Sequence, residues 1–430
     1  MPEFVPPRGM RDLSIDESEK FSLVLSRIEP VIRSFGFRRV EPTAVEHLET
    51  LQAKSGDAVL NEVYYFKDKG GRDLGLRFDL TVGIARMVAN DFGLPEPIKV
   101  YAVAPVWRYD EPQAGRYRCH WQWDVECFGP SEVYADAEVI ACALSIVRAA
   151  GLPDTIAKIS HRGLVSAILR ELGVEPGEQT LRVLRALDKS SKILPGELLD
   201  LLGQAGLKEE VVKRTLALSE IKGNYEEVEN SLRRFESEQT KSTLAELRTI
   251  WDALGPLGVR DSCTIDLGVV RGLDYYDGAV FEGFDKALGL SVFGGGRYNA
   301  LTAIYGKRAL PATGVAGGME RLILALERHS SLSLGSTTKR IFVAVTEEEV
   351  RKQAIELATE LRARGIVTEF PLKRWPLRRQ LEYANASGFT YVVVVGKREL
   401  ESGLFTLKEL KSGNQSQRSK EELVSALLPP

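Results

Sequence analysis

The 430-residue sequence predicts an α+β protein in which a β-sheet domain is interrupted by a mostly helical insertion and followed by a small α/β domain. Three observations predict this arrangement. β-like runs lie between residues 97 and 129, and similar runs resume at 262–301. Residues 155–255 carry Leu, Glu, Lys and Arg at helical spacing, with short Gly or Pro breaks. From residue 339 onward, strands alternate with helices, which predicts a small, mainly parallel sheet.

The N-terminal part begins with a helix and a broken strand. Apolar residues recur at helical spacing, which predicts a helix over about 16–35. The run 37–49 predicts a strand that is interrupted by a proline, because proline cannot donate to a strand ladder. Residues 74–90 pass from an extended run into a helix, for which Asp79 or Thr81 is a plausible N-cap.

Two extended runs, 98–110 and 118–129, form the centre of the predicted sheet, and a helix is expected over 131–150. Apolar and polar residues alternate in the second run, so every second side chain shares one face. Such a face usually points to solvent. Four polar groups in register could equally form the floor of a site for a small polar ligand. These groups are His120, Gln122, Asp124 and Glu126.

The C-terminal part is separated from the rest by residues 330–338, which are rich in Gly and Ser and suit a linker. Beyond it we expect a strand over 340–345, an amphipathic helix that ends at Gly365, and a buried strand over 391–396. This part carries a small basic excess, which is densest at 373–380. A solvated surface is the ordinary explanation of such a patch, and a nucleic-acid partner is the functional one.

The composition indicates an ordinary globular protein and excludes several classes. A net charge of −3 gives no global reason to bind nucleic acid. The four cysteines form no CxxC pair, so they predict reduced thiols rather than a zinc or redox site. No apolar run approaches the ~20 residues of a membrane span, and the N-terminus resembles no secretory signal. We therefore expect a cytoplasmic protein with no membrane partner and no tightly bound metal.

Arginines follow or lie near several of the predicted strands and suggest a site for a polyanion. Guanidinium groups match phosphate oxygens in pairs and remain charged. The sequence carries no Walker A motif, no nucleophile elbow and no HExxH motif. A reaction that needs only positioning and electrostatics, such as attack of a carboxylate on an α-phosphate, fits better. The arginines are Arg108, Arg116, Arg118, Arg271, Arg297 and Arg321.

Five stretches resemble motifs of histidyl-tRNA synthetases, which are class II aminoacyl-tRNA synthetases. GFRRVEPTAVEHLE (36–49) resembles motif 1, and PVWRYDEPQAGRYRCHWQWDVECFG (105–129) resembles motif 2. VVRGLDYYDGAVFE (269–282) and FGGGRYNAL (293–301) resemble the two histidine-specific signatures. TGVAGGMERL (313–322) resembles motif 3. The resemblance implies the class II synthetase fold, an α+β catalytic domain with a mixed, mostly antiparallel sheet.

The resemblance implies a site for ATP, which enters as its complex with Mg²⁺. Arg108 and Arg271 would contact the α-phosphate, and Arg271 would replace a metal that other class II enzymes use there. Arg116 and Arg321 would hold the β- and γ-phosphates. His120 stands where the family carries a phenylalanine that stacks on adenine.

The resemblance also implies a pocket for L-histidine. Asp79, Thr81 and Gln122 would receive its amino and carboxylate ends. An imidazole offers N–H donors, so the carboxylate and the phenol that would face it are sensible partners. The implied pocket residues are Asp79, Thr81, Gln122, Glu126, Arg271, Tyr275, Tyr276 and Tyr298.

Domains, partners and tRNA contacts follow from the same resemblance. Residues 1–154 and 256–332 would form the catalytic domain, 155–255 the insertion, and 339–430 an anticodon-binding domain. Motif 1 implies a homodimer. Histidine tRNA would be read at its 5′ end and bound by the basic patch. The implied tRNA contacts are Gln113, Arg374, Arg378 and Arg379.

The activity that these motifs imply is ligation of histidine to its tRNA through histidyl-adenylate. A non-enzymatic alternative is the synthetase-like regulatory subunit of ATP phosphoribosyltransferase, and a generic nucleotide-binding protein is another. The regulatory relatives typically lack the C-terminal domain and the arginines of the ATP site. Both features are present in this sequence.

Overall fold

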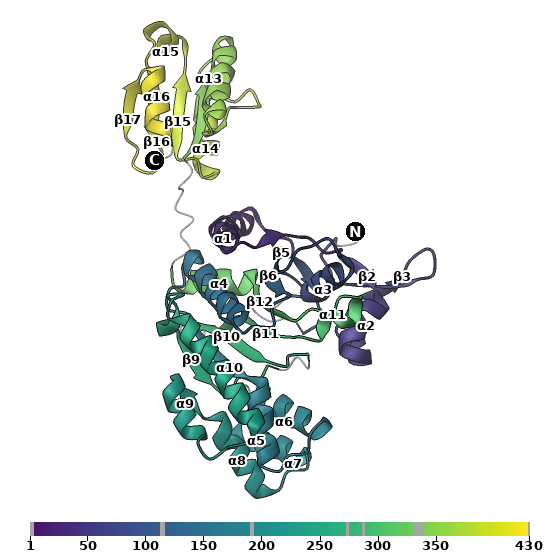
Figure 1. Cartoon of the computed structure of the whole chain (residues 1–430). Coiled ribbons are helices and arrows are strands. Elements are labelled where there is room, and N and C mark those ends of the chain that lie inside the picture. Colours follow the sequence, from purple (N-terminus) through teal and green to yellow (C-terminus); the bar gives the residue numbers. More distant parts are fainter. Residues whose placement is uncertain are drawn as a thin grey trace. The chain divides into compact units, whose positions relative to one another are not determined.

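The computed structural model describes residues 4–111, 117–189, 193–271, 275–285, 289–330 and 339–428 (Figure 1). The chain divides into two compact units, residues 1–332 and 333–430, and each is described by itself. Most of the expected linker, residues 331–338, lies outside the described residues.

A large mixed sheet organises the first unit. Most neighbouring strands in it are antiparallel, whereas β1 with β5 and β7 with β9 are parallel. The predicted mixed, mostly antiparallel sheet is therefore confirmed. Among the described residues it has nine strands, in spatial order β1 (Arg38–Arg39), β5 (Ile98–Trp107), β6 (Cys119–Phe128), β12 (Ala312–Gly318), β11 (Leu290–Arg297), β10 (Ala279–Asp285), β7 (Ile156–His161), β9 (Cys263–Asp266) and β8 (Lys222–Gly223).

One face of this sheet is covered by α1 (Ile15–Ser34), α4 (Tyr134–Ala150) and α12 (Met319–Arg328). Figure 1 labels α1 and α4. The apolar side chains of β6 point to these helices. Trp123 is fully buried there, and the Trp121 ring packs edge-on against Phe21 of α1 with centroids 4.9 Å apart. The predicted first helix is confirmed. A capping box between Ser14 and Glu17 fixes its start.

The opposite face is covered by α3 (Thr81–Asn90) and α11 (Leu301–Tyr305), with α2 (Leu48–Ser55) beside them. The apolar residues of α3 pack on alternate side chains of β5 and on two tyrosines, Tyr276 and Tyr298. This face therefore carries both polar strand residues and aromatic residues.

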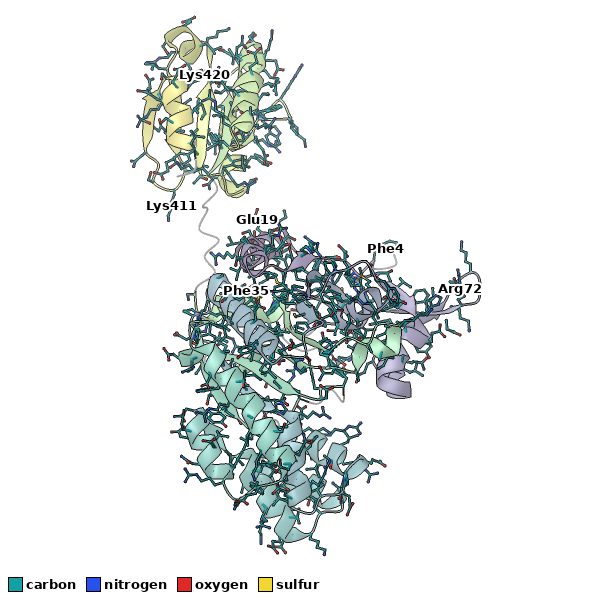
Figure 2. All side chains as sticks on the ribbon, in the orientation of Figure 1. Phe4, Glu19, Phe35, Arg72, Lys411 and Lys420 are labelled. Carbon is teal, nitrogen blue, oxygen red and sulfur yellow. The ribbon has the colours of Figure 1, made fainter. Side chains whose placement is uncertain are left out.

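A small sheet, with three strands among the described residues, packs beside α2. Its order is β2 (Val45–His47), β4 (Asp73–Leu76) and β3 (Tyr65–Lys67). The predicted strand over 37–49 is two strands in different sheets, β1 and β2, on either side of Pro42. Arg72 lies at the tip of the β3–β4 hairpin (Figure 2).

The helical insertion begins with a strand, contrary to expectation. Residues 156–161 form β7, which pairs in antiparallel register with β10. Its alternating side chains bury Ala157 and Ile159, so pairing with the sheet outweighs helix formation. Apart from the short strand β8, the other elements of the insertion among the described residues are helices: α5 (Arg162–Glu171), α6 (Glu178–Asp188), α7 (Pro195–Gln204), α8 (Glu209–Ser219), α9 (Tyr225–Leu232) and α10 (Glu238–Leu254).

The second unit is an α/β domain whose sheet has five strands among the described residues. Their order is β14 (Val367–Glu369), β13 (Arg340–Val345), β15 (Tyr391–Val395), β16 (Phe405–Glu409) and β17 (Gln415–Arg418). The first three are parallel and the last two antiparallel. The prediction of a mainly parallel sheet was wrong because the hairpin of β16 and β17 was missed.

Helices flank this smaller sheet. The predicted amphipathic helix is α13 (Arg351–Ala363), and Gly365 follows it with φ 78°. This left-handed conformation favours glycine and suits the end of a helix. The other helices are α14 (Leu377–Ala386), α15 (Lys397–Ser402) and α16 (Lys420–Leu427).

Candidate active site

The polar face of β6 is buried rather than solvated. Gln122 is 6% exposed, Asp124 0% and Glu126 1%. This face is covered by α3 and by two tyrosines of later segments, Tyr276 and Tyr298. The alternate polar side chains of β6 therefore form a buried polar surface, the floor of the candidate site. Buried carboxylates require polar partners, so their surroundings indicate what this floor can bind.

Hydrogen bonds join this floor to the start of α3. Thr81 Oγ1 donates to Glu126 Oε1 over 2.8 Å and lies 3.2 Å from Asp124 Oδ2. Gln122 Nε2 donates to Asp124 Oδ1 over 2.8 Å. The carboxylate of Asp79 accepts from the Val82 amide over 3.0 Å, as expected of a helix-capping side chain, although the N-cap position itself is Leu80.

Asp124 is a candidate binding residue that the motif comparison did not single out. Its place on the polar face of the strand was the available signal. Burial, opposed in part by the hydrogen bonds from Gln122 and Thr81, raises the pKa of Asp124 to about 7. The neighbouring charge of Asp79 raises this pKa, and that of Arg108 lowers it. A carboxylate in this position would be stabilised by a cationic group of a ligand.

Three tyrosines close the other side of the floor. The ring centroids of Tyr275 and Tyr276 are 4.4 Å apart, and that of Tyr298 lies 5.6 Å and 6.2 Å from them. Tyr298 donates its hydroxyl proton to Glu126, and Tyr275 donates to the Tyr276 hydroxyl over 3.3 Å. Burial raises the pKa of Tyr275 and of Tyr298, which keeps both phenols protonated and able to donate.

Glu126 reaches this position only because β12 carries a glycine beside it. A Cβ at Gly314 would lie 1.5 Å from Glu126 Oε2 and 2.9 Å from the Tyr298 hydroxyl. Both atoms belong to buried side chains that are hydrogen-bonded to each other, so a methyl group at this position would have to displace them. The glycine-rich strand of motif 3, β12, therefore also makes room for a buried carboxylate.

Two arginines border this buried cluster. Arg108 donates Nε to the Phe78 carbonyl over 2.7 Å and Nη2 to Gln122 Oε1 over 3.4 Å. The Arg271 side chain packs against β11 at Gly294. A Cβ on this glycine would lie 2.1 Å from Arg271 Nη1. Its Nη1 is also 3.5 Å from Glu282 Oε1. Both guanidinium groups thus lie beside polar groups of the floor and its walls.

The remaining predicted ATP contacts lie near the ends of the strands. Arg321 Nη1 donates to the Ser291 carbonyl of β11 over 3.2 Å. His120, next to Gln122 on the same face of β6, has its Nδ1 3.2 Å from the Tyr117 carbonyl. Two predicted residues, Gln113 and Arg116, lie outside the described residues.

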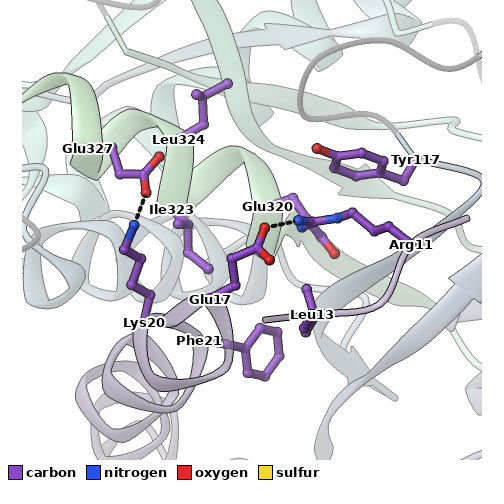
Figure 3. Close-up of a pocket in the computed structure, with 10 residues that line it drawn as sticks. All are labelled: Arg11, Leu13, Glu17, Lys20, Phe21, Tyr117, Glu320, Ile323, Leu324 and Glu327. Carbon is purple, nitrogen blue, oxygen red and sulfur yellow. Dashed lines mark hydrogen bonds and ion pairs between the residues drawn. The ribbon is translucent and has the colours of Figure 1, made fainter. Parts of the chain in front are cut away.

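A separate cavity of about 120 Å³ lies between α1 and α12 (Figure 3). Four of its charged groups form two ion pairs, Arg11 with Glu17 and Lys20 with Glu327. Glu320, which accepts from the Trp121 amide over 3.0 Å, also lines it. The cavity contains none of the predicted ATP or histidine contacts.

The basic patch of the second unit combines cations with an aromatic ring. The side chains of Arg374 and Arg378 are 85% and 90% exposed. The guanidinium of Arg379 lies 5.3 Å and the ammonium of Lys373 5.8 Å from the centroid of the Trp375 ring. A ring among cations suits stacking with a nucleic-acid base.

Comparisons with known proteins match both units. A family model described as histidyl-tRNA synthetase matches residues 9–322, and one described as anticodon binding domain matches residues 340–428. A histidine–tRNA ligase of Thermococcus kodakarensis is 40% identical and covers 98% of this chain and 97% of its own. One of Pyrococcus horikoshii is 38% identical and covers 97% of both chains.

Solved structures agree in fold. Histidyl-tRNA synthetase from Nostoc sp. PCC 7120 superimposes with a TM-score of 0.87 at 26% identity, covering 99% of both chains. A Bacillus halodurans protein described as an ATP phosphoribosyltransferase regulatory subunit/histidyl-tRNA synthetase gives 0.77 at 27% identity, covering 92% of this chain and 99% of its own.

Proposed function

The chain belongs to the histidyl-tRNA synthetase family, and we propose that histidine meets ATP at the buried polar floor of β6. The chain is an ATP-dependent histidine–tRNA ligase. It activates L-histidine with ATP to histidyl-adenylate and pyrophosphate, and then transfers histidine to the 3′-terminal ribose of histidine tRNA. The assignment of these steps to residues is our proposal.

The observation that carries this assignment is the environment of Glu126. Its carboxylate is 1% exposed and accepts from the hydroxyls of Thr81 and Tyr298. An imidazole N–H would add a further donor to this carboxylate, and the Tyr276 phenol would face the same ring. An apolar amino acid would leave these groups unpaired, so the pocket would select histidine.

The amino and carboxylate ends of histidine would lie toward the start of α3. Asp79 and Asp124 offer negative charge for the ammonium group, and Thr81 adds a hydroxyl. Gln122 lies between Asp124 and Arg108 and can orient the carboxylate of histidine. This places the nucleophilic oxygen beside Arg108.

Adenylation then needs positioning and charge. A carboxylate oxygen of histidine attacks the α-phosphorus, the bond to the bridging oxygen breaks, and pyrophosphate leaves with its electron pair. Arg108 and Arg271 would stabilise the charge that builds on the α-phosphate, as preorganised cations do at low reorganisation cost. Arg321 and Arg116 would hold the leaving pyrophosphate, and His120 would support the adenine. ATP enters with Mg²⁺ as part of the substrate.

In the second step the terminal ribose hydroxyl attacks the carbonyl carbon of the adenylate and AMP leaves. The exposed cations Arg374, Arg378 and Arg379 would hold the tRNA in the anticodon-binding domain, where Trp375 can stack on a base. Gln113 would read the 5′ end of the tRNA. Both contacts remain predictions.

The regulatory-subunit alternative is less well supported. One structural relative carries that description, so the fold alone does not decide. Arg108, Arg271 and Arg321 are retained, and the anticodon-binding domain is present. A protein that only senses histidine has no use for either feature.

We also propose that the ligase is a cytoplasmic homodimer. Several large apolar side chains on the small sheet are exposed: Val45 37%, Tyr65 58% and Phe66 43%. A second copy would cover them, in agreement with motif 1. Within the described residues, no helix is long and apolar enough to cross a membrane.

Substitution of Glu126 tests the proposed pocket. Glu126→Gln keeps the size of the side chain but removes its charge, so the KM for histidine in ATP–pyrophosphate exchange should rise at least about tenfold. The KM for ATP should change by less than about twofold, because no phosphate contact is lost. An unchanged KM for histidine would refute the imidazole assignment.

A further inference from the structure

The stretch that carries Tyr275 and Tyr276 ends in an aspartate, Asp277, that the reaction does not use. Its carboxylate accepts from the Asn299 amide N–H over 3.1 Å and from Asn299 Nδ2 over 3.1 Å. Its own amide donates to the Arg297 carbonyl over 3.1 Å. These bonds join the segment of two tyrosines to the segment that holds the third, Tyr298.

Asn299 also connects these two hydrogen-bonded segments to the interior of the protein. Its Oδ1 accepts from Arg297 Nη1 over 3.3 Å, so the amide lies between a carboxylate and a guanidinium. Arg297 is 3% exposed, and its Nη2 is 2.7 Å from Asp136 of α4, which is fully buried. The contact between Asp277 and Asn299 is therefore supported by the buried ion pair between Arg297 and Asp136 of α4.

A glycine permits this arrangement. A Cβ at Gly278 would meet the Arg297 side chain at 2.9 Å to 3.1 Å. The Arg297 side chain packs against the backbone at Gly278, just before β10, on its way to α4. It can do so only because position 278 carries no side chain. Asp277, Gly278 and Arg297 therefore form one structural unit, although they come from two different sequence motifs.

We propose that Asp277 and Asn299 form a clamp that positions the three tyrosines around the imidazole and so sets the affinity of the enzyme for histidine. The proposal rests on the assignment of this pocket to histidine. Tyr276 and Tyr298 are adjacent in sequence to the clamp residues, and their rings lie 6.2 Å apart. A change in the spacing of the two segments moves both rings against Glu126. Asp277 and Asn299 are positioning residues and contact no reacting atom.

In the hydrogen bond between the two clamp side chains, Asn299 is the donor and Asp277 the acceptor, and these roles can be exchanged. Asn299→Asp places two carboxylates within about 3 Å of each other, and they repel. Asp277→Asn can place its side-chain NH₂ group opposite the NH₂ group of Asn299, so that two donors face each other. If the Asn299 amide turns to avoid this, its NH₂ group faces the Arg297 guanidinium, which is also a donor. The double variant, which combines Asp277→Asn with Asn299→Asp, restores every donor and acceptor. The side-chain amide at position 277 would then donate to the carboxylate at position 299, and that carboxylate would still accept from Arg297.

The test uses the full-length enzyme in histidine-dependent ATP–pyrophosphate exchange. Each single variant should raise the KM for histidine about fivefold and leave that for ATP within about twofold, and the double variant should return to within about twofold of the wild type. Both side chains are exposed, so the single variants should melt within a few degrees of the wild type. Glu401→Gln, which changes an exposed carboxylate of the second unit, is the matched control.

Three outcomes would overturn the clamp. They are single variants with an unchanged KM for histidine, equal rises in the two KM values, and a double variant no better than the singles. Glu126→Gln is measured in parallel. If Glu126→Gln leaves the KM for histidine unchanged, the pocket assignment itself is wrong and the clamp falls with it. If Glu126→Gln raises this KM but the clamp variants do not, only the clamp is wrong.

Discussion

At the scale of single residues, our account assigns the selectivity of the site to the buried polar face of β6. Glu126 lies among hydroxyl donors, and Asp124 lies beside Asp79, with no lysine or arginine in direct contact among the partners described for it. Burial of a carboxylate is costly unless its charge is neutralised or paired. We propose that the ammonium group of histidine offsets this cost at Asp124 and that the imidazole N–H donates to Glu126. Substrate binding would then lower the electrostatic cost of burying the Asp124 carboxylate.

Asp124→Asn should separate stability from function. The raised pKa, about 7 against 3.8, means that the folded state holds a proton which the unfolded state has lost between about pH 4 and pH 7. The free energy of unfolding therefore falls as the pH rises through this window, and the loss persists above pH 7. At pH 8 the variant should be more stable than the wild type by about 2–4 kcal/mol, and at pH 4 the two should be equal.

The functional half of this prediction has the opposite sign. The KM for histidine of Asp124→Asn should rise about tenfold at pH 8, because the ammonium loses a carboxylate. Thermal melts at pH 4 and pH 8, together with exchange kinetics, measure both effects. Equal destabilisation at the two pH values would show that the wild-type carboxylate carries no electrostatic cost.

Arg271→Ala should impair catalysis more than binding. The guanidinium charge is most valuable when negative charge builds on the α-phosphate, so kcat of ATP–pyrophosphate exchange should fall about 10²- to 10³-fold. The dissociation constant of histidine should change only a few-fold. Calorimetric titration with histidine alone gives the second quantity. Comparable losses in both would assign Arg271 to substrate binding instead.

At the scale of elements, the sequence predicted those structures whose pattern is local. The helix over 16–35, the two central strands and the helical texture of the insertion were confirmed because periodicity alone specifies them. Strand β7 was missed because its pairing with β10 joins segments that are distant in sequence. The hairpin of β16 and β17 joins neighbouring segments and was missed for a different reason: the polar run over 415–418 shows no apolar strand signal.

Glycines show the same limit within the site. Their number in motif 3 does not indicate which side chains pack against them, whereas the structure shows this for Gly314. Gly314 admits Glu126, so Gly314→Ala should abolish histidine-dependent exchange, because the methyl group would displace the carboxylate from the imidazole position. Gly318→Ala is the control, since the nearest atoms to its Cβ lie 4.0 Å away. Activity of Gly314→Ala near the wild-type level would refute the close approach.

At the scale of the whole molecule, the two units divide the reaction. The first contains the candidate site for histidine and ATP, and the second has the exposed cations and the ring suited to nucleic acid. Spacing alone could not predict that the proposed histidine contacts lie in one cluster, because these residues come from β6, α3 and the segments beside β10 and β11. Only the family resemblance connected them.

Neutralisation of the basic patch should affect only the second step. With Arg374, Arg378 and Arg379 changed to Gln, aminoacylation should fall at least about tenfold at physiological salt, because phosphate contacts dominate nucleic-acid affinity. Pyrophosphate exchange should remain at the wild-type level, since the tRNA takes no part in it. Measurement of both reactions on one preparation decides. Equal loss in both would refute the assignment of the second unit to tRNA.

The measurement that tests the central claim most directly is ATP–pyrophosphate exchange by the purified chain with each of the twenty amino acids in turn. Our account predicts exchange with histidine and at least about 10³-fold lower kcat/KM with any other amino acid, because only an imidazole satisfies Glu126 and the tyrosines. Absence of exchange with histidine, or efficient exchange with a different amino acid, would contradict it.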